Sequence, residues 1–348
     1  MFLKGRSEAT GKLFTSEKSF PTISLFQKTN IENYFFDKLK GVVFAVNKAT
    51  LAALKLLSHS SPDIKKTYKI HRQLVTLTHK AIIKPPYYKI WNHKITRNGY
   101  DIPVRIFSPP NDLPHPILLF FHGGGWVTGN IESYDSVCST MARITDRMIV
   151  SVDYRLAPEY PFPTALEDCY CVAKEIFLNR ALNTDDITII GDSAGGNLAA
   201  ALSLMARDRG EFLPKQQILI YPATFNNHSE TSPFPSVREN GTDYILTSKT
   251  ISDYMEMYCS DKKDWRNPYF APLLEKDFSR QPRTLIITAE YCPLRDEGEA
   301  YGRKLQEAGN DVIIERMSDA LHGYFSSLPK KHHLIQDTYK IINRFLWE

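Results

Sequence analysis

A serine between two glycines is the residue in this sequence best placed to do chemistry. The segment IIGDSAGGNLA, residues 189–199, carries Ser193 in a G-x-S-x-G turn between an apolar strand-like run and a helical pattern. This is the pattern of a nucleophile elbow. The flanking glycines are needed because a β-carbon on either side would collide with the neighbouring strand or helix, and the sharp turn strains the serine backbone. The pattern predicts Ser193 as a nucleophile at a helix N-terminus, where negative charge is stabilised.

Three consecutive glycines follow a second apolar run, in FFHGGGW, residues 120–126. Adjacent glycines leave backbone N–H groups uncovered, and such a run can form an oxyanion hole together with the N–H of the residue after the serine, here Ala194. A phosphate-binding loop is the alternative. The run lacks both a P-loop lysine and the G-x-G-x-x-G spacing, so the oxyanion interpretation is favoured.

A histidine in the right position completes the chemistry. A serine hydroxyl is a poor nucleophile until an imidazole takes its proton, and in hydrolases with this elbow the histidine comes last in the chain. The sequence has ten histidines, so position decides among them. His322, in DALHGYF just after the last predicted strand, is the predicted general base.

These residues must be positioned by a sheet, and short β-branched runs do alternate with helical patterns from about residue 85 onward. The candidate strands are YKIWNHKI, PVRIFSP, PILLFFH, MIVSVDY, DITIIGD, QILIYP, RTLIITAE and DVIIERM. Alternation of this kind predicts an α/β protein with a mostly parallel eight-stranded sheet flanked by helices. An amphipathic segment at 333–347 predicts a closing helix.

The segment before residue 85 has a different pattern, with apolar residues at helical spacing between lysines from Phe35 to Leu57. A second irregular, aromatic-rich stretch interrupts the strands at about 224–270, and it is too long for a simple loop. Together the two pieces predict a helical cap over one end of the sheet. A packing or oligomerisation element, or a membrane-surface helix, is the alternative for the N-terminal piece.

The composition is that of an ordinary globular protein, with 43% hydrophobic and 24% charged residues in a chain of 348. A net charge of +4, without a block of like charge, gives no reason to expect a nucleic-acid partner. The five cysteines cannot all pair, and their spacing does not suggest a zinc site. Neither a secretory signal nor a membrane-spanning stretch is apparent, so we expect a cytoplasmic protein without stable membrane insertion.

The motifs HGGGW, DYRLAPE, GDSAGG, PLRDEG and HGYF, in this order and spacing, resemble the hormone-sensitive-lipase-like family of α/β-hydrolase esterases, in the branch with an aspartate before the nucleophile. The resemblance runs from about residue 103 to the C-terminus. It implies an α/β-hydrolase fold, in which residues 86–348 form the catalytic domain and residues 1–85 and 224–270 form the cap. It also implies hydrolysis of short- to medium-chain acyl esters. No metal or cofactor is needed for this mechanism.

The resemblance assigns a role to individual positions. It carries the nucleophile onto Ser193, the base onto His322, and the oxyanion donors onto Gly124, Gly125 and Ala194. A second set, consisting of Arg155 and Glu159 in DYRLAPE and Asp192 before the nucleophile, is implied to support the site, and surface charge is the alternative.

One position departs from the family pattern. Where the family has DPLRDEG after the seventh strand, this sequence has CPLRDEG, so that Cys292 occupies the position of the triad acid. That acid accepts a hydrogen bond from histidine Nδ1–H and stabilises the imidazolium, which a neutral thiol does poorly. Three outcomes stay open. The thiol ionises beside the imidazolium, or Asp296, Glu297 or Asp319 replaces it, or the enzyme is slow because of a natural or introduced lesion.

Function is therefore expected in one of three forms. A serine carboxylesterase acting on a small-molecule ester is favoured, because the serine, the histidine and the glycines all remain. An amide or formamide hydrolase would use the same machinery. A non-catalytic ligand-binding pseudoenzyme is the alternative that Cys292 suggests. A homodimer is compatible with such a fold. The aromatic residues of the cap region suggest an apolar acyl pocket; they are Phe35, Phe36, Trp126, Phe234, Tyr244, Tyr254 and Tyr258.

Overall fold

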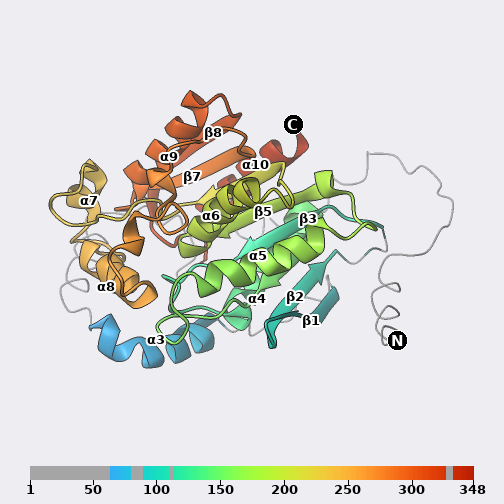
Figure 1. Ribbon diagram of the computed structural model, residues 1–348, viewed down its shortest axis with the longest axis horizontal. Coiled ribbons are helices and arrows are strands. Elements are labelled where there is room, and N and C mark those ends of the chain that lie inside the picture. The colour runs from blue at the N-terminus through green and yellow to red at the C-terminus, as the bar shows by residue number, and fades with distance from the viewer. Residues whose placement is uncertain (1–62, 80–88, 110, 112, 327–331) are drawn as a thin grey trace. The chain divides into compact units, whose positions relative to one another are not determined.

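The computed structural model describes residues 63–79, 89–109, 111, 113–326 and 332–348, which Figure 1 draws as a coloured ribbon. The apolar pattern between Phe35 and Leu57 lies outside the described residues. No helix among the described residues has the length and apolar character needed to cross a membrane.

A single eight-stranded sheet organises the described chain, with strand order β1-β2-β4-β3-β5-β6-β7-β8. The strands are β1 (Lys89–Arg97), β2 (Tyr100–Ser108), β3 (Ile117–Phe121), β4 (Met148–Val152), β5 (Ile187–Asp192), β6 (Gln216–Ile220), β7 (Arg283–Tyr291) and β8 (Val312–Leu321). Strand β2 is antiparallel to both β1 and β4, and all the other pairs are parallel. The eight strands predicted from the sequence, and the mostly parallel sheet, are confirmed.

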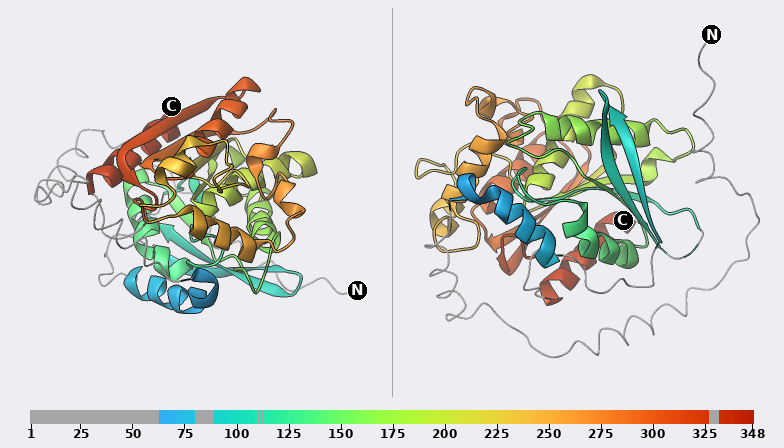
Figure 2. Two further views of the ribbon diagram at one scale, coloured as in Figure 1. Left: turned by 90° about the vertical axis from the view of Figure 1, so that its left-hand side faces the viewer. Right: turned by 90° about the horizontal axis from the view of Figure 1, so that it is seen from below.

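Burial follows from the position of each strand in the sheet. The central strands β3 and β5 are buried along their whole length, as expected where helices cover both faces of a parallel sheet. Helices α4 (Ile131–Thr145) and α10 (His332–Trp347) pack together on one face, and Asn343 Nδ2 donates to the carbonyl of Ile144 between them. Helices α5 (Thr164–Phe177), α6 (Ala194–Arg209) and α9 (Arg295–Glu307) cover the other face, as Figure 2 shows.

Between β6 and β7 the chain leaves the sheet for a long excursion. It forms α7 (Pro235–Asn240), α8 (Ser248–Tyr258) and two 3₁₀ turns, Asp264–Arg266 and Pro272–Leu274. Helix α3 (Ile64–His79) packs against α4 and α8, so two segments distant in sequence meet beside the sheet. Figure 1 shows α3 below α8.

Candidate active site

Ser193 sits at a strained turn between β5 and α6. Its backbone angles are φ 55° and ψ −118°, a left-handed region that side-chain-bearing residues rarely adopt. A β-carbon at Gly191 would collide with the backbone of Gly195, and one at Gly195 would collide with the backbone of Phe121. The two glycines are therefore required by close approach of the backbone, as the sequence pattern predicts.

His322 lies against this serine. Ser193 Oγ and His322 Nε2 are 2.9 Å apart, which is hydrogen-bond distance. The histidine follows β8 directly, and Leu321 pairs with Tyr291 at the end of the neighbouring strand β7. This register brings the residues after the two strands, 292 and 322, next to each other. The proximity of Ser193 and His322 is what the sequence predicts for a nucleophile and its base.

Cys292 occupies the other side of the imidazole. Its Sγ lies 3.1 Å from His322 Nδ1 and also accepts the N–H of Leu294 at 3.3 Å. The cysteine is 0% exposed, and this burial raises the pKa of its thiol far above the ordinary value, although the Leu294 N–H acts in the opposite direction. The resting thiol is thus neutral, which gives no support to the thiolate alternative.

The environment also sets the protonation of the imidazole. Burial lowers the pKa of His322 to about 3, and no neighbouring charge in the described part of the chain opposes that effect. The resting imidazole is therefore neutral and able to accept a proton. It is also a weak base, because an imidazolium formed here would gain little stabilisation from its surroundings.

The two carboxylates expected as back-up acids make their contacts elsewhere. Asp296 Oδ2 accepts the N–H of Ser236, and its Oδ1 accepts from Arg295. Glu297 is fully buried, with Oε1 accepting the N–H of Thr224 and Oε2 lying 2.6 Å from His228 Nε2. The structure thus gives neither Asp296 nor Glu297 a hydrogen bond to His322, since both tie α9 to the excursion after β6.

Asp319 lies in an irregular part of β8. The β7–β8 register shifts between Ala289 and Tyr291, and Asp319 has a left-handed φ of 57° in the corresponding part of β8. Its N–H donates to Glu290 Oε2 at 2.7 Å, and the residue is exposed. The imidazole Nδ1 faces Cys292 instead, so the structure does not bring Asp319 into the acid's place.

The glycine run lies beside Ser193 with part of its backbone available. The N–H of Gly123 donates to Asp192 Oδ1 at 2.8 Å. Within the described chain, no acceptor is recorded for the N–H groups of Gly124, Gly125 and Ala194. Ala194 is the first residue of α6, whose N–H has no intrahelical acceptor. All three glycines, with Ser193 and Ala194, line one cavity. The N–H groups of Gly124, Gly125 and Ala194 can donate hydrogen bonds to a negatively charged oxygen there.

Asp192 anchors the start of the glycine run. Besides the N–H of Gly123, its carboxylate accepts the hydroxyls of Tyr134, Tyr221 and Ser326, at 3.0, 3.2 and 3.0 Å. Burial raises the pKa of Asp192 to about 6, against the lowering effect of these donors. Asp192 was expected to support the site, and in the structure its carboxylate holds the backbone of Gly123 at the start of the glycine run. Tyr134 and Ser326 were not predicted, because nothing in their local sequence distinguishes them.

The other two supporting residues expected from DYRLAPE have different partners. Arg155 pairs with the buried Asp168 at 2.7 and 2.8 Å. Glu159 forms a two-pronged ion pair with Arg72 of α3 at 2.8 and 3.1 Å. Arg72 also donates to the carbonyl of Val127, just after the glycine run, at 2.5 Å. Sequence analysis missed Arg72, since its partners lie more than 50 positions away.

The cavity above Ser193 measures about 700 Å³. Its apolar wall comes from α3, from α8 and from the loop before α8; the residues are Ile64, Ile70, Leu74, Val75, Ile245, Leu246, Ile251 and Tyr254. Among the described residues that line it, none is a lysine or an arginine. The cavity is therefore suited to an uncharged, largely apolar ligand.

The expected aromatic lining is only partly present. Trp126 and Tyr254 line the cavity, whereas the buried Tyr258 stacks on Trp126 with ring centres 4.6 Å apart. Phe234 packs against Phe225, and Tyr244 stacks on Tyr291. Neither Phe234 nor Tyr244 is among the lining residues, and Phe35 and Phe36 lie outside the described part of the chain. Aliphatic side chains outnumber aromatic ones in the apolar part of the lining.

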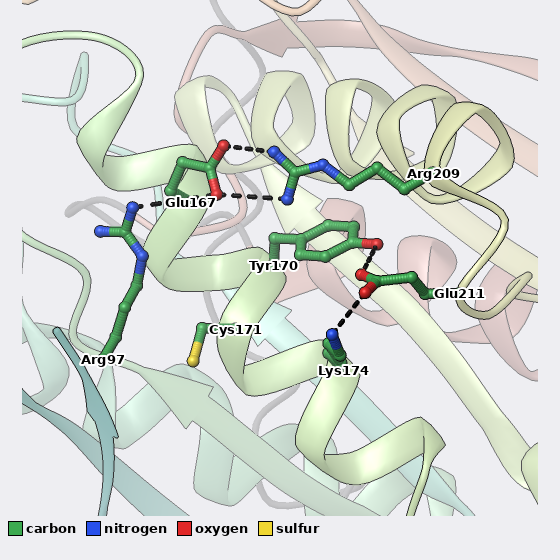
Figure 3. Close-up of a pocket in the computed structure, with 7 residues that line it drawn as sticks. All are labelled: Arg97, Glu167, Tyr170, Cys171, Lys174, Arg209 and Glu211. Carbon is green, nitrogen blue, oxygen red and sulfur yellow. Dashed lines mark hydrogen bonds and ion pairs between the residues drawn. The ribbon is translucent and has the colours of Figure 1, made fainter.

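A separate hollow of about 480 Å³ is highly charged (Figure 3). Its ionised side chains form pairs, as between Glu167 and Arg209 and between Lys174 and Glu211. Arg97 adds contacts to Glu167 and Asp168. The positive and negative side chains of this hollow thus pair with each other. No group of three or more potential metal ligands occurs among the described residues.

Comparisons with other proteins agree on one group of relatives. A family model for the alpha/beta hydrolase fold matches residues 118–326. An arylesterase of Saccharolobus solfataricus is 36% identical over 263 residues, which cover 74% of this chain and 84% of the relative. An ethyl acetate hydrolase of Pseudomonas putida is 35% identical over 236 residues, covering 66% and 73% of the two chains. The solved structure of a hyperthermophilic esterase from Pyrobaculum calidifontis is 33% identical, has a TM-score of 0.75, and covers 86% of this chain and 99% of its own.

Proposed function

Because the chain belongs to the α/β-hydrolase fold family, among its hormone-sensitive-lipase-like esterases, we propose that it is a serine carboxylesterase working through an acyl-enzyme on Ser193. The observation that carries this proposal is the 2.9 Å contact between Ser193 Oγ and His322 Nε2. That contact occurs at a strained elbow beside the available N–H groups of Gly124, Gly125 and Ala194.

Each step follows from these atoms. Ser193 Oγ attacks the ester carbonyl carbon while His322 Nε2 takes the hydroxyl proton. The N–H groups of Gly124, Gly125 and Ala194 stabilise the negative charge that develops on the carbonyl oxygen. The imidazolium then gives its proton to the departing alcohol, which leaves an ester between Ser193 and the acyl group. Water repeats the sequence, releasing the carboxylic acid and restoring Ser193.

Cys292 is the weak part of this machinery. With Nε2 accepting from the serine, the neutral imidazole carries its proton on Nδ1 and donates it toward Sγ. A neutral thiol accepts this bond but offers no full negative charge to the imidazolium. In serine proteases, loss of a proper triad acid costs on the order of 10⁴-fold in kcat. Turnover should accordingly be slow relative to an enzyme with a carboxylate here.

The substrate class follows from the cavity. Its aliphatic wall and the absence of Lys and Arg among its described lining residues favour an uncharged ester with a short to medium acyl chain. We assign the cap role to α3 and to the excursion containing α7 and α8, because α3 and α8 both contribute to this wall. The N-terminal cap boundary at residue 85 and the insertion at 224–270 belong to the same proposal.

Hydrolysis of p-nitrophenyl butyrate by the parent, Ser193→Ala and His322→Ala proteins tests the proposal. We expect measurable turnover by the parent and background rates for both variants. Equal rates in all three would contradict it. Absence of turnover by both the folded parent and folded Cys292→Asp would favour the non-catalytic binder that Cys292 suggests. A matched p-nitroanilide substrate distinguishes ester from amide hydrolysis, and we expect the ester to be preferred.

A further inference from the structure

Helix α7 is docked on the loop that carries Cys292. We define the acid loop as residues 290–296, from the end of β7 to the start of α9. Asn240, at the last position of α7, donates through Nδ2 to the carbonyl of Glu290 at 3.2 Å and to the carbonyl of Cys292 at 3.3 Å. One amide group of the excursion thus holds the main chain on both sides of Tyr291 and at the cysteine itself.

Ser236 fixes the other half of the acid loop. Its Oγ donates to the carbonyl of Pro293 at 2.9 Å and accepts the N–H of Asp296 at 3.2 Å. Its own N–H donates to Asp296 Oδ2 at 2.7 Å. Ser236 is 0% exposed and Asn240 is 3% exposed, so water does not readily replace these bonds.

We propose that Asn240 and Ser236 are positioning residues that hold Cys292 against His322 Nδ1. This inference rests on the proposed function, because it concerns the acid position of the same site. The carbonyl and the Sγ of Cys292 are joined through the Cα and Cβ of the same residue, so fixing the carbonyl limits where the sulfur can lie. The loop's own bonds, such as Leu294 N–H to Sγ, curl it around the cysteine but do not attach it to another element.

The same helix is joined to the cavity wall. The N–H of Ser248, the first residue of α8, donates to the carbonyl of Gly241 at 2.8 Å. Ser248 Oγ donates to the carbonyl of Val237 in α7, and a β-carbon at Gly241 would collide with both Ser248 and Val237. Helix α8 then contributes Tyr254 to the cavity. Helix α7 thus connects an element that lines the cavity to the loop that carries Cys292.

Alkylation of Cys292 by iodoacetamide, followed by peptide mass spectrometry, tests this inference without requiring any ester hydrolysis. The thiol reacts only when the acid loop opens locally. We expect Asn240→Ala to raise the Cys292 reaction rate about tenfold, since a buried hydrogen-bonding group is lost. Buried Cys138, far from α7 in sequence and part of α4, should keep its rate and serves as the internal reference.

Asn226→Ala is the matched control. Asn226 belongs to the same excursion and also donates through Nδ2 to a backbone carbonyl, that of Trp265 at 2.9 Å, but not to the acid loop. It should leave the Cys292 rate unchanged. An unchanged Cys292 rate in Asn240→Ala, or an equal increase in Asn226→Ala, overturns the inference. If the Cys138 rate also rises in Asn240→Ala, the fold as a whole is loosened, and Ser236→Ala is tested instead: its Cys292 rate should rise while its Cys138 rate stays unchanged.

A double-mutant cycle tests the role in catalysis. Asn240→Ala should lower kcat for p-nitrophenyl butyrate about tenfold with little change in KM, and this loss should disappear when position 292 is already alanine. A loss that persists in Cys292→Ala would mean that Asn240 acts through some other part of the fold. Failure of the proposed function would appear separately, as absence of turnover with the alkylation result intact.

Discussion

The sulfur of Cys292 lies 3.1 Å from Nδ1 of His322, on the opposite side of the ring from Ser193. The three side chains therefore have the arrangement that the proposed catalytic triad requires, with a thiol in the place of the carboxylate. A carboxylate at this place would stabilise the imidazolium that forms when Ser193 attacks. A buried neutral thiol leaves the imidazole oriented but poorly stabilised when charged.

Replacing Cys292 with Asp should raise the activity. The new carboxylate would accept both the Nδ1–H of His322 and the N–H of Leu294, which now reach the sulfur. We expect kcat for p-nitrophenyl butyrate to increase at least about 100-fold, part of the roughly 10⁴-fold that a triad acid contributes in serine proteases. Asp319→Asn is the control, since this residue is exposed and the imidazole Nδ1 faces Cys292 instead, so its carboxylate should be dispensable for orienting His322. A fast parent that gains nothing from Cys292→Asp would remove position 292 from the mechanism.

The same substitution should shift the pH dependence of kcat/KM. In the proposed mechanism the neutral imidazole is the active base, so activity should fall as the pH drops through its pKa. Because burial lowers the pKa of His322 to about 3 in the parent, this fall should lie well below neutral pH. A carboxylate at 292 would raise that pKa, so the acidic limb of Cys292→Asp should move to higher pH. Identical acidic limbs in a comparison of the two pH profiles would contradict the assignment of Cys292 as the partner of His322.

Asp192 should make stability depend on pH. Its pKa is raised from 3.8 to about 6, so its contribution to stability is present below pH 4 and is lost as the pH rises through 6. Asn cannot ionise and should not show this loss. The unfolding free energy of Asp192→Asn relative to the parent should therefore increase by about 2 kcal/mol between pH 4 and pH 7. Urea titrations at the two pH values measure it, and a difference independent of pH would show that Asp192 does not titrate in this range.

Substitution of Gly124 should damage the oxyanion site. Its φ is 121°, and a β-carbon there would collide with the backbone of Thr128. We expect Gly124→Ala to lower kcat by about 10²-fold or more, because loss of one oxyanion-hole donor lowers kcat by about this factor in other enzymes. Gly99→Ala is the control for backbone strain, because Gly99 also has a positive φ, of 77°, but open space around it. A full rate for Gly124→Ala in a folded protein, judged by its Tm, would exclude the Gly124 N–H as a donor.

Local patterns were sufficient to predict the sheet, and the order of the motifs along the chain was sufficient to predict that Ser193 and His322 lie together. Most strands contain a short run of apolar residues, and the glycines around Ser193 are visible as a G-x-S-x-G pattern within five consecutive residues. The continuation of β8 to Leu321 was less visible, because an irregular register near Asp319 interrupts its pattern.

The supporting contacts could not be predicted, because they join segments that are distant in sequence. Asp296 and Glu297 look like any acidic residues at the start of a helix, and only the folded chain places them against Ser236 and His228. Arg72 similarly looks like one more basic residue of an amphipathic helix. Long-range hydrogen bonds of this kind carry no local signature in a single sequence.

Labelling by a fluorophosphonate, followed by peptide mapping, tests the central claim most directly, because the probe reacts only with an activated serine. We expect one adduct per chain, located on Ser193, formed faster in Cys292→Asp and lost in His322→Ala. An unlabelled Ser193 in the folded parent and in folded Cys292→Asp, or an adduct that forms equally well without His322, would contradict the assignment of Ser193 as the catalytic nucleophile.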